Sequence, residues 1–398
     1  MQYPTLDQID VSGKTVFLRV DFNVTLDEKG QIRDDARIKA AIPTIKKLLE
    51  NNVKLVLGSH LGRPKGKVDK KYSLLPVASR LAELLETEVI MPDECVGMEV
   101  KKLISEMREN SIILLQNLRF HAGEESNDEK FAAQLAELAD VYISDAFGVL
   151  HRAHASTVGM LKHFKEKAVG KLVEKEISFL SRVLHEPQKP YVVVLGGAKI
   201  SDKILVIEEL MNVADKVIVG GGMAYTFLKA QGIEVGKSLV EDNKLSNAKR
   251  ILERAHNKGI EFLLPHDHVL GKKFDNETQT KIVTEAEDWG QDMGLDIGPE
   301  SIKKFSEALA DAKTVFWNGP MGVYEMSSFS KGTLSIAKNI SDLEATTVVG
   351  GGDSLAAINS SGLNEKFTHL STGGGASLKF LEGSELPGLK AIICKENR

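Results

Sequence analysis

Cysteine is almost absent from this chain of 398 residues, which contains only Cys95 and Cys394. Neither has neighbours in a metal-ligand pattern, so the sequence predicts no disulfide framework and no zinc site, and it favours a reducing, cytoplasmic location. The chain also lacks a basic N-terminal segment followed by an apolar core, and no apolar run is long enough to span a bilayer. We therefore expect no membrane partner.

An excess of basic charge is missing as well. The 51 lysines and arginines are outnumbered by 56 aspartates and glutamates, and the formal net charge is −5. A partner held by bulk charge, such as a nucleic acid, is therefore not expected. Internal repeats and low-complexity segments are absent, and the length exceeds that of a typical single hydrophobic core, which predicts two domains.

Short apolar runs, each followed by a polar or glycine-rich turn and an amphipathic segment, recur along the chain. This alternation of strand and helix is typical of α/β proteins with parallel sheets covered on both faces. Ligands of such sheets collect beyond the carboxyl ends of the strands. We predict strands at 16–20, 53–57, 112–115, 141–143, 191–195, 216–219, 262–264, 314–317 and 347–349, and helices at 37–50, 75–85, 128–139, 174–184, 203–211 and 301–310.

In the first half of the chain, the residues that follow the predicted strands are charged. Arginine forks bind phosphate and carboxylate oxygens through paired hydrogen bonds. Any one of these arginines alone is more often a solvated surface residue, but their recurrence at comparable positions predicts a pocket for a small, multiply anionic ligand. The charged and polar groups at these positions are Arg19, Asp21, Asn23, His60, Arg63, Arg119, Asp145, His151, Arg152 and His154, and Arg37 at the start of a predicted helix joins them.

In the second half, glycines follow the strands instead, and the segment 347–358 is the clearest example. Its three glycines and the helix after them form a phosphate-binding pattern, and Asp353 fits beside a phosphate if Mg²⁺ lies between them. In the alternative interpretation, Asp353 or Ser354 only caps the helix. No P-loop or dinucleotide motif is present. Lys199 and Lys203 are predicted to share one face at a helix start, either as an anion site or as a solvated pair.

Ten motifs, taken in order, resemble those of one enzyme family. They are RVDFNV, SHLGRPKG, LLQNLRF, DAFG, HRAHAST, LGGAKISDKI, GGGMAYTFLK, WNGPMGVYE, VVGGGDS and LSTGGGAS. Because they run through nearly the whole chain, the sequence is identified as a member of the phosphoglycerate kinase family, of the bacterial type.

The resemblance implies two Rossmann-like domains whose parallel sheets face each other across a hinged cleft. Residues 1–170 would bind the triose phosphate, 171–190 would form an interdomain helix and linker, and 191–377 would bind the nucleotide. Because the triose and nucleotide residues lie in different domains, we expect joints near 169–173 and near 371–377. The tail, 378–398, would return to the first domain. The expected protein is a cytoplasmic monomer that reversibly transfers a phosphoryl group from 1,3-bisphosphoglycerate to ADP, giving 3-phosphoglycerate and ATP.

The matching motifs also imply the roles of individual residues. The triose would be held by Asp21, Phe22, Asn23, Arg37, His60, Leu61, Gly62, Arg63, Arg119 and Arg152, and Arg37 would also reach the migrating group. The nucleotide would contact Lys203, Gly220, Gly221, Gly294, Asn318, Pro320, Glu325, Gly351, Gly352, Asp353 and Ser354, with Asp353 binding Mg²⁺. Arg37, Lys199, Lys203, Gly351 and Gly374 would act on the group in transfer.

Four sites depart from the common family pattern. Thr25 replaces a usual proline, Gln116 and Lys379 each replace a usual glutamate, and the segment 149–150 is Val-Leu instead of Thr-Ala. None of them removes an assigned residue, but carboxylate contacts at 116 and 379 are not carried over.

Phosphoryl transfer needs in-line positioning and positive charge more than covalent chemistry, and a carboxylate acceptor needs no general base. The histidines are therefore interpreted as binding groups. One alternative is a kinase with another acceptor, either an acyl-phosphate or a sugar kinase. The other is a non-catalytic nucleotide-binding module.

Overall fold

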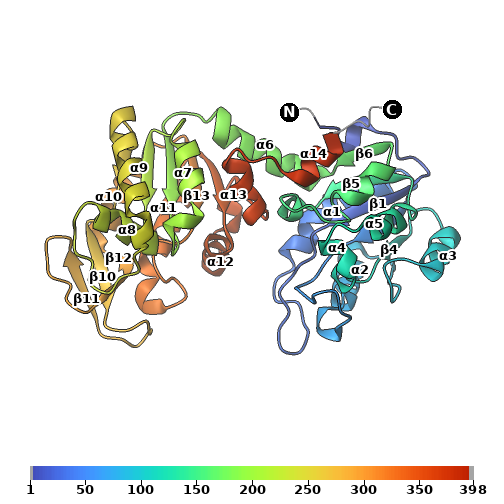
Figure 1. Cartoon of the computed structure of the whole chain (residues 1–398), viewed down its shortest axis with the longest axis horizontal. Helices are drawn as coiled ribbons and strands as arrows, with labels where there is room; N and C mark the ends of the chain where they lie inside the picture. Colours follow the sequence, from blue (N-terminus) through green and yellow to red (C-terminus); the bar gives the residue numbers. More distant parts are fainter. Residues whose placement is uncertain (1–2, 394–398) are drawn as a thin grey trace. The chain divides into compact units, whose positions relative to one another are not determined.

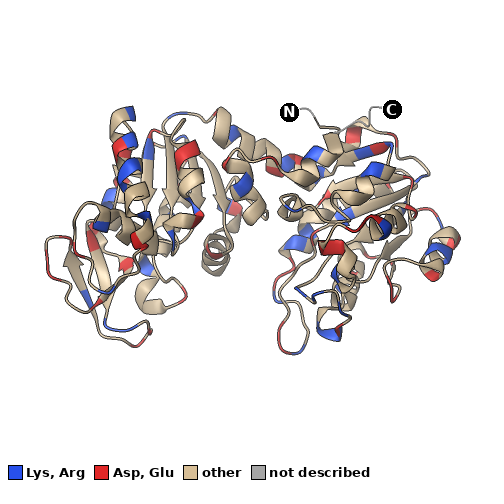
Figure 2. Ribbon diagram, in the orientation of Figure 1, with Lys and Arg blue, Asp and Glu red and all other residues tan. Residues whose placement is uncertain are grey.

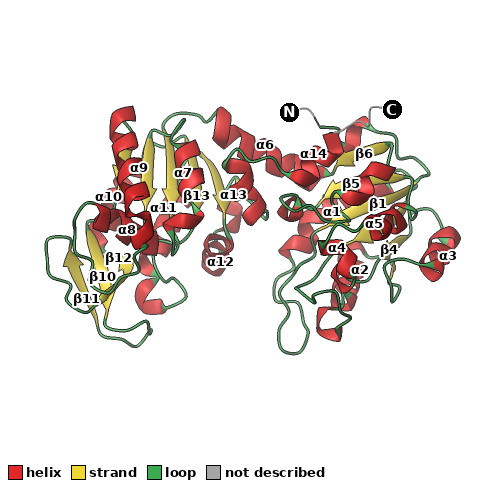
Figure 3. Ribbon diagram, viewed as in Figure 1, coloured by secondary structure: helices red, strands yellow, loops and turns green. Residues whose placement is uncertain are grey.

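The computed structural model describes residues 3–393, and its chain divides into two compact units. The first contains residues 3–177 and 385–393, and the second contains residues 178–384. Figures 1 and 3 show that each unit is a sheet flanked by helices, so the predicted α/β class is confirmed. Acidic and basic residues are interspersed over the helices of both units (Figure 2).

The first unit is built on a six-stranded parallel sheet in the order β3-β4-β2-β1-β5-β6. Its strands are β1 (Thr15–Val20), β2 (Lys54–Gly58), β3 (Val89–Ile90), β4 (Ile112–Leu114), β5 (Val141–Asp145) and β6 (Glu166–Val169). Its helices are α1 (Ala36–Leu49), α2 (Leu75–Leu85), α3 (Met98–Glu106), α4 (Ala122–Glu125), α5 (Glu129–Ala136) and α14 (Pro387–Ile393). Short 3-10 helices are η1 (Leu6–Gln8), η2 (Lys70–Tyr72), η3 (Leu118–Phe120), η4 (Phe147–Val149) and η5 (Gly159–His163).

Strand β1 is buried on both faces, which explains its nearly continuous apolar run. Val16, Leu18 and Val20 join the core formed with α1 and α2. Phe17 points to the opposite face, where its ring stacks on Tyr142 of β5 with centroids 6.1 Å apart. Alternate residues thus serve two cores, as the two-residue period of a strand requires.

The second unit contains a six-stranded parallel sheet in the order β15-β14-β13-β7-β8-β9. Its strands are β7 (Tyr191–Leu195), β8 (Lys216–Val219), β9 (Glu261–Leu263), β13 (Thr314–Asn318), β14 (Thr346–Gly350) and β15 (His369–Leu370). Its helices are α7 (Ile204–Leu210), α8 (Gly222–Ala230), α9 (Leu245–Lys258), α10 (Pro299–Leu309), α11 (Lys331–Ser341), α12 (Gly352–Ser361) and α13 (Gly375–Leu381), with 3-10 helices η6 (Ile200–Asp202), η7 (Asp242–Lys244), η8 (Ser327–Phe329) and η9 (Asn364–Lys366). Helices α10, α11 and α12 pack on one face of the sheet, and α7 and α9 lie in front of it in Figure 1.

A small antiparallel sheet in the second unit is not among the predicted elements. It consists of β10 (Asp267–Gly271), β11 (Thr280–Thr284) and β12 (Met293–Ile297), with β10 in the middle. Its strands carry few consecutive apolar residues, because β11 is largely exposed and β10 and β12 each contain an aspartate. The apolar-run criterion that finds buried parallel strands therefore does not detect them.

Both six-stranded sheets reverse their strand order at one point. In the first sheet the reversal lies between β1 and β5, and in the second it lies between β7 and β13. The carboxyl ends of the strands at such a point leave a crevice in which ligands of doubly wound sheets bind. Many of the predicted site residues follow these strands or their neighbours.

Helix α6 (Lys171–His185) begins in the first unit, and the division between the units falls inside it, after residue 177. The predicted joint near 169–173 is held in the first unit by several hydrogen bonds. Asp145 Oδ1 accepts from the backbone N–H groups of Leu172, at 2.9 Å, and Val173, at 3.3 Å. The N–H of Lys171 donates to Thr44 Oγ1 at 2.9 Å. Bending at these residues would break those bonds.

The predicted tail divides at a later residue than expected. Residues 378–384 belong to the second unit, because α13 packs against α7 there, and only residues from 385 onwards join the first unit. Helix α14 then packs beside β6 and η5. The last predicted tail residues, 394–398, lie outside the described residues.

Candidate active site

The loops after β1 and β2 are tied together, and this brings the predicted triose residues side by side. Ser59 Oγ accepts from the N–H of Phe22 at 2.9 Å, and Asn23 Oδ1 accepts from the N–H of Gly62 at 2.8 Å. The side chains of Phe22 and Leu61 are buried in the core, so only their backbone can face a ligand. Phe22 and Leu61 can therefore take part in the predicted site only through their backbone groups.

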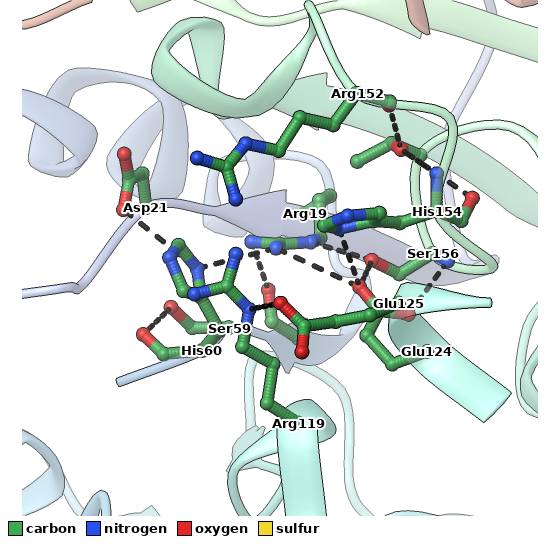
Figure 4. A network of polar contacts seen from close by, with 12 residues as sticks. Arg19, Asp21, Ser59, His60, Arg119, Glu124, Glu125, Arg152, His154 and Ser156 are labelled. Carbon is green, nitrogen blue, oxygen red and sulfur yellow. Dashed lines mark hydrogen bonds and ion pairs between the residues drawn. The ribbon is translucent and has the colours of Figure 1, made fainter. Parts of the chain in front are cut away.

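Asp21 lies among cationic groups (Figure 4). Its carboxylate forms an ion pair with Arg37 at 2.5 Å. It also lies 3.9 Å from His60 Nδ1, as Figure 4 shows. Burial alone would raise the pKa of Asp21, but the guanidiniums of Arg37 and Arg19 outweigh it and lower that pKa. Asp21 therefore stays ionised and holds the Arg37 guanidinium, which remains partly exposed.

His60 is neutral in this pocket. Burial is the main reason that its pKa lies well below the ordinary value, and the nearby guanidiniums of Arg19, Arg119 and Arg37 lower it further. Arg19 Nη2 lies 3.4 Å from His60 Nδ1. Since a guanidinium can only donate, this contact favours the tautomer in which Nδ1 accepts and Nε2 carries the proton.

The remaining predicted arginines differ in how firmly they are held. Arg119 is buried, donates to the carbonyl of Gly62 at 2.8 Å and pairs with Glu125 at 3.3 Å. Arg152 is half-buried, and its Nε lies 3.1 Å from His151 Nε2. Arg63 is exposed and makes no side-chain hydrogen bond or ion pair within residues 3–393. Its guanidinium is therefore available to a ligand without breaking a contact.

Four buried polar residues adjoin this pocket although the family motifs assigned none of them to the triose. They are Arg19, Glu124, His154 and Ser156. A local signal existed for Arg19, since a charge inside an apolar strand run must be paired. Glu124 and Ser156 carry no such signal.

The glycine-rich turn after β14 begins helix α12, as predicted. Gly351 is the N-cap residue, with φ of 91°, and no side chain caps the helix. Asp353 is exposed and forms no hydrogen bond or ion pair with any described residue. Ser354 Oγ instead accepts from the N–H of Gly319, at 2.7 Å, and joins this turn to the loop after β13. The capping interpretation of Asp353 is therefore wrong.

Lys199 and Lys203 do not share a helix face, contrary to the prediction. Lys199 precedes η6 and is exposed, whereas Lys203 lies between η6 and α7 and is 8% exposed. The Lys203 ammonium donates to Asn318 Oδ1 at the end of β13. Burial lowers the pKa of Lys203 to about 8, and Asp202 and Asp353 partly oppose this.

Five of the six glycines predicted for the nucleotide and transfer sites fall into two groups. A methyl group on Gly220, Gly221 or Gly294 would collide with Met321, with the backbone of Gly197, or with Tyr225, at 2.6, 2.6 and 2.2 Å. Glycine is therefore required there for packing. Gly352 and Gly374 instead have no neighbouring atom within 4 Å of such a methyl.

Pro320 and Glu325 complete the predicted nucleotide set. The carbonyl of Pro320 accepts from the N–H of Gly197 at 2.9 Å and so joins the turns after β7 and β13. Glu325 is exposed and forms no side-chain hydrogen bond or ion pair among residues 3–393. Its carboxylate is free to accept a hydrogen bond from a ligand.

The structure accounts for the departures from the family pattern. Gln116 Oε1 accepts from the N–H groups of Leu74 and Asn117, and its Nε2 donates to Ser73 Oγ, so the amide uses both ends. Leu150 packs on Gly388 of α14. The exposed Thr25 contributes its backbone carbonyl to the N–H of Arg33, at 2.9 Å, and Lys379 pairs with Glu382 at 2.6 Å.

Residues 3–393 contain no group of three or more His, Cys, Asp or Glu side chains that could hold a metal ion. Asp353 is thus a single carboxylate, and an Mg²⁺ bound there needs oxygens from phosphates and water, as is usual for this ion. None of the helices described here is both long and apolar enough to cross a membrane.

Known proteins resemble this chain over nearly its whole length. The profile of the family described as phosphoglycerate kinase matches residues 6–384. A phosphoglycerate kinase of Anaeromyxobacter dehalogenans (strain 2CP-C) is 54% identical over 398 residues, with full coverage of both chains. One from Clostridium botulinum (strain Hall) is 51% identical over 391 residues and 98% of each chain. A solved phosphoglycerate kinase structure from Coxiella burnetii is 37% identical, with a TM-score of 0.88 over 98% of this chain and 99% of that one. The chain therefore belongs to the phosphoglycerate kinase family, whose members are phosphotransferases of glycolysis.

Proposed function

We propose that this chain transfers the phosphoryl group of 1,3-bisphosphoglycerate directly to ADP, with Mg²⁺, to give 3-phosphoglycerate and ATP. The observation that carries this proposal is that two kinds of residue gather at the two strand-order reversals. Guanidinium and imidazole groups lie at the reversal between β1 and β5, and glycine turns with Lys203 lie at the reversal between β7 and β13. A coupled assay of ATP formation from 1,3-bisphosphoglycerate tests it. Turnover with another acyl phosphate or a sugar only, or nucleotide binding without turnover, would favour the alternatives.

Positive charge and position carry the proposed chemistry. The acceptor carboxylate of 3-phosphoglycerate is ionised near neutral pH, so no general base is needed. Arg37, Lys199 and Lys203, with the backbone N–H groups of Gly351 and Gly374, would stabilise the phosphoryl oxygens during in-line transfer. Burial lowers the pKa of His154 to about 4, and with the neutral His60 this supports hydrogen bonding to the triose instead of proton transfer.

Asp353 is the proposed ligand of the Mg²⁺ that accompanies the nucleotide. Its exposed carboxylate has no partner among the described residues, stands at the first turn of α12 and is close enough to Lys203 to affect that residue's pKa. A cation bound there would neutralise phosphate charge beside Gly351 and Gly352.

We expect Asp353→Asn to raise the Mg²⁺ concentration needed for half-maximal activity by about tenfold or more, because a metal ligand is lost. Binding of 3-phosphoglycerate without metal should not change. Titration of activity with Mg²⁺ and calorimetry of 3-phosphoglycerate binding measure both. The matched control is Glu365→Gln, which removes from the same unit an exposed carboxylate that forms no side-chain hydrogen bond or ion pair among the described residues. An unchanged Mg²⁺ requirement would refute the metal role.

Transfer also requires the two units to approach, because the proposed triose and nucleotide residues belong to different units. We therefore expect the radius of gyration to fall further with both substrates bound than with either alone, since closure needs contacts from both sides. Small-angle scattering of the free, singly liganded and doubly liganded chain measures this. An identical radius in all states of an active enzyme would contradict closure.

We further propose that the chain is a monomer, and the particle mass from the same scattering data tests this. We also propose a cytoplasmic location.

A further inference from the structure

A buried ion pair lies behind the proposed triose pocket. The side chains of Arg19 and Glu124 are 1% and 0% exposed, and Arg19 Nη2 lies 4.0 Å from Glu124 Oε1 (Figure 4). Stability alone is a weak reason for such a pair, because packed apolar side chains of similar volume are often as stable. The contacts of Glu124 indicate a second role.

Glu124 holds the loop that carries two groups of the pocket. Its carboxylate accepts from the N–H of Ser156 at 2.9 Å and from Ser156 Oγ at 2.6 Å. Its backbone carbonyl also accepts from the N–H of Ala155 at 2.9 Å. Ala155 and Ser156 directly follow His154 in the chain, and Arg152 stands two residues before His154. Helix α4, which contains Glu124, begins shortly after Arg119, so one short helix connects two basic segments of the pocket.

The same network extends to the imidazole of the pocket. Arg19 Nε donates to Ser156 Oγ at 2.8 Å, while its Nη2 lies 3.4 Å from His60 Nδ1. Ser156 thus stands between Glu124 and Arg19, and Arg19 stands between Ser156 and His60. A change at Glu124 can reach His60 only by moving Arg19 or Ser156.

We propose that Glu124 is a positioning residue for phosphoglycerate. Without contacting the ligand, it holds the loop of Arg152 in place and, through Ser156 and Arg19, keeps the His60 proton on Nε2. This inference rests on the proposed function of the pocket and adds a residue to it.

The charge of Glu124 makes the proposal testable, because a charge effect and a positioning effect predict opposite changes in the KM for 3-phosphoglycerate. Glu124→Gln removes a negative charge near an anion pocket, so charge alone would lower the KM for 3-phosphoglycerate. Loss of positioning would raise that KM by about tenfold and lower kcat, because misplaced groups bind and orient the substrate poorly. The KM for ATP should stay within about twofold of the wild type, since the nucleotide residues lie in the other unit.

The experiment compares the full-length wild type with Glu124→Gln, Ser156→Ala and the double variant in steady-state kinetics. The two effects should be coupled, with the double variant little worse than Glu124→Gln, because both residues act through one chain of contacts. Nitrogen-15 NMR, with a His60→Gln spectrum to assign the signal, should show Nε2 protonation in the wild type and a mixture in Glu124→Gln. The matched control is Glu129→Gln, whose side chain is 90% exposed and lies 3.7 Å from Lys162.

Several results would overturn the proposal. They are additive effects of the two substitutions, a lowered KM for 3-phosphoglycerate, or a KM for both substrates that rises only in step with a lower Tm. If Glu124→Gln does not fold, Ser156→Ala decides by the same KM comparison, because it removes a single hydroxyl. A wild type that fails to phosphorylate 3-phosphoglycerate would refute the proposed function, whereas wild-type kinetics in Glu124→Gln would refute only this inference.

Discussion

Replacing Arg37 with alanine should lower kcat by more than about a hundredfold, which corresponds to a loss of roughly 3 kcal/mol of transition-state stabilisation. The KM for 3-phosphoglycerate should rise much less, because Arg63, Arg119 and Arg152 remain to hold the ground state. Arg37 is suited to this role because its guanidinium is only partly buried and is aimed by Asp21. Steady-state kinetics in the direction of ATP consumption measures both constants.

The pairing of Arg37 with Asp21 calls for a second variant. Loss of Arg37 leaves the Asp21 carboxylate unpaired, and that free charge would repel an anionic substrate and raise KM. Arg37→Ala combined with Asp21→Asn should therefore recover part of the KM increase but none of the kcat. Arg33→Ala is the matched control, since Arg33 is exposed and its guanidinium forms no hydrogen bond or ion pair within residues 3–393. An unchanged kcat in Arg37→Ala would refute the assignment.

Replacing Lys203 with methionine should also lower kcat by about a hundredfold or more, while the protein becomes no less stable at pH 7. Activity is lost without a loss of stability because the ammonium is buried. Burial lowers the pKa of Lys203 to about 8, so the folded protein disfavours the charged form, and an isosteric apolar side chain removes that cost. Kinetics and chemical unfolding on the same samples measure the two quantities.

The pH dependence of stability provides an independent check on Lys203. The pKa of Lys203 is about 8 in the folded protein, and the ordinary pKa of lysine is 10.5. Between these two pH values, the unfolded chain binds the proton that the folded chain has released. The wild type should therefore gain stability relative to Lys203→Met as pH rises through this window, by up to about 1.4 kcal/mol per pH unit. Lys249→Met, at an exposed position of α9, is the matched control. A lower Tm with activity lost in proportion would instead indicate that Lys203 only anchors Asn318.

Most of the parallel framework was predictable from local pattern. The runs 191–195 and 216–219 coincide with β7 and β8, and the pattern at 75–85 coincides with α2. Such strands are buried on both faces, so their apolar character shows in consecutive residues. The short edge strands β3, β6 and β15 and the antiparallel sheet β10–β12 were not predicted. Their strands are short or partly exposed and carry no comparable run.

The sequence by itself determined which kinds of residue follow each strand: arginines and a histidine in the first half, glycines and lysines in the second. It did so because strand ends, turns and helix starts are local, and their residues stand next to one another in the chain. The family motifs and the residue roles that they imply are local for the same reason.

Only the tertiary structure decided which of these residues meet and which are free. Arg19 and Ser156 are 137 residues apart and become neighbours because β1 and β5 pair in register. Asp353 is left without a partner because the hydroxyl of Ser354, not its own carboxylate, joins the α12 turn to Gly319. Gly221 must be glycine for packing, while Gly352 faces open space. These outcomes depend on strand register and on atoms contributed by distant segments, neither of which a local sequence pattern contains.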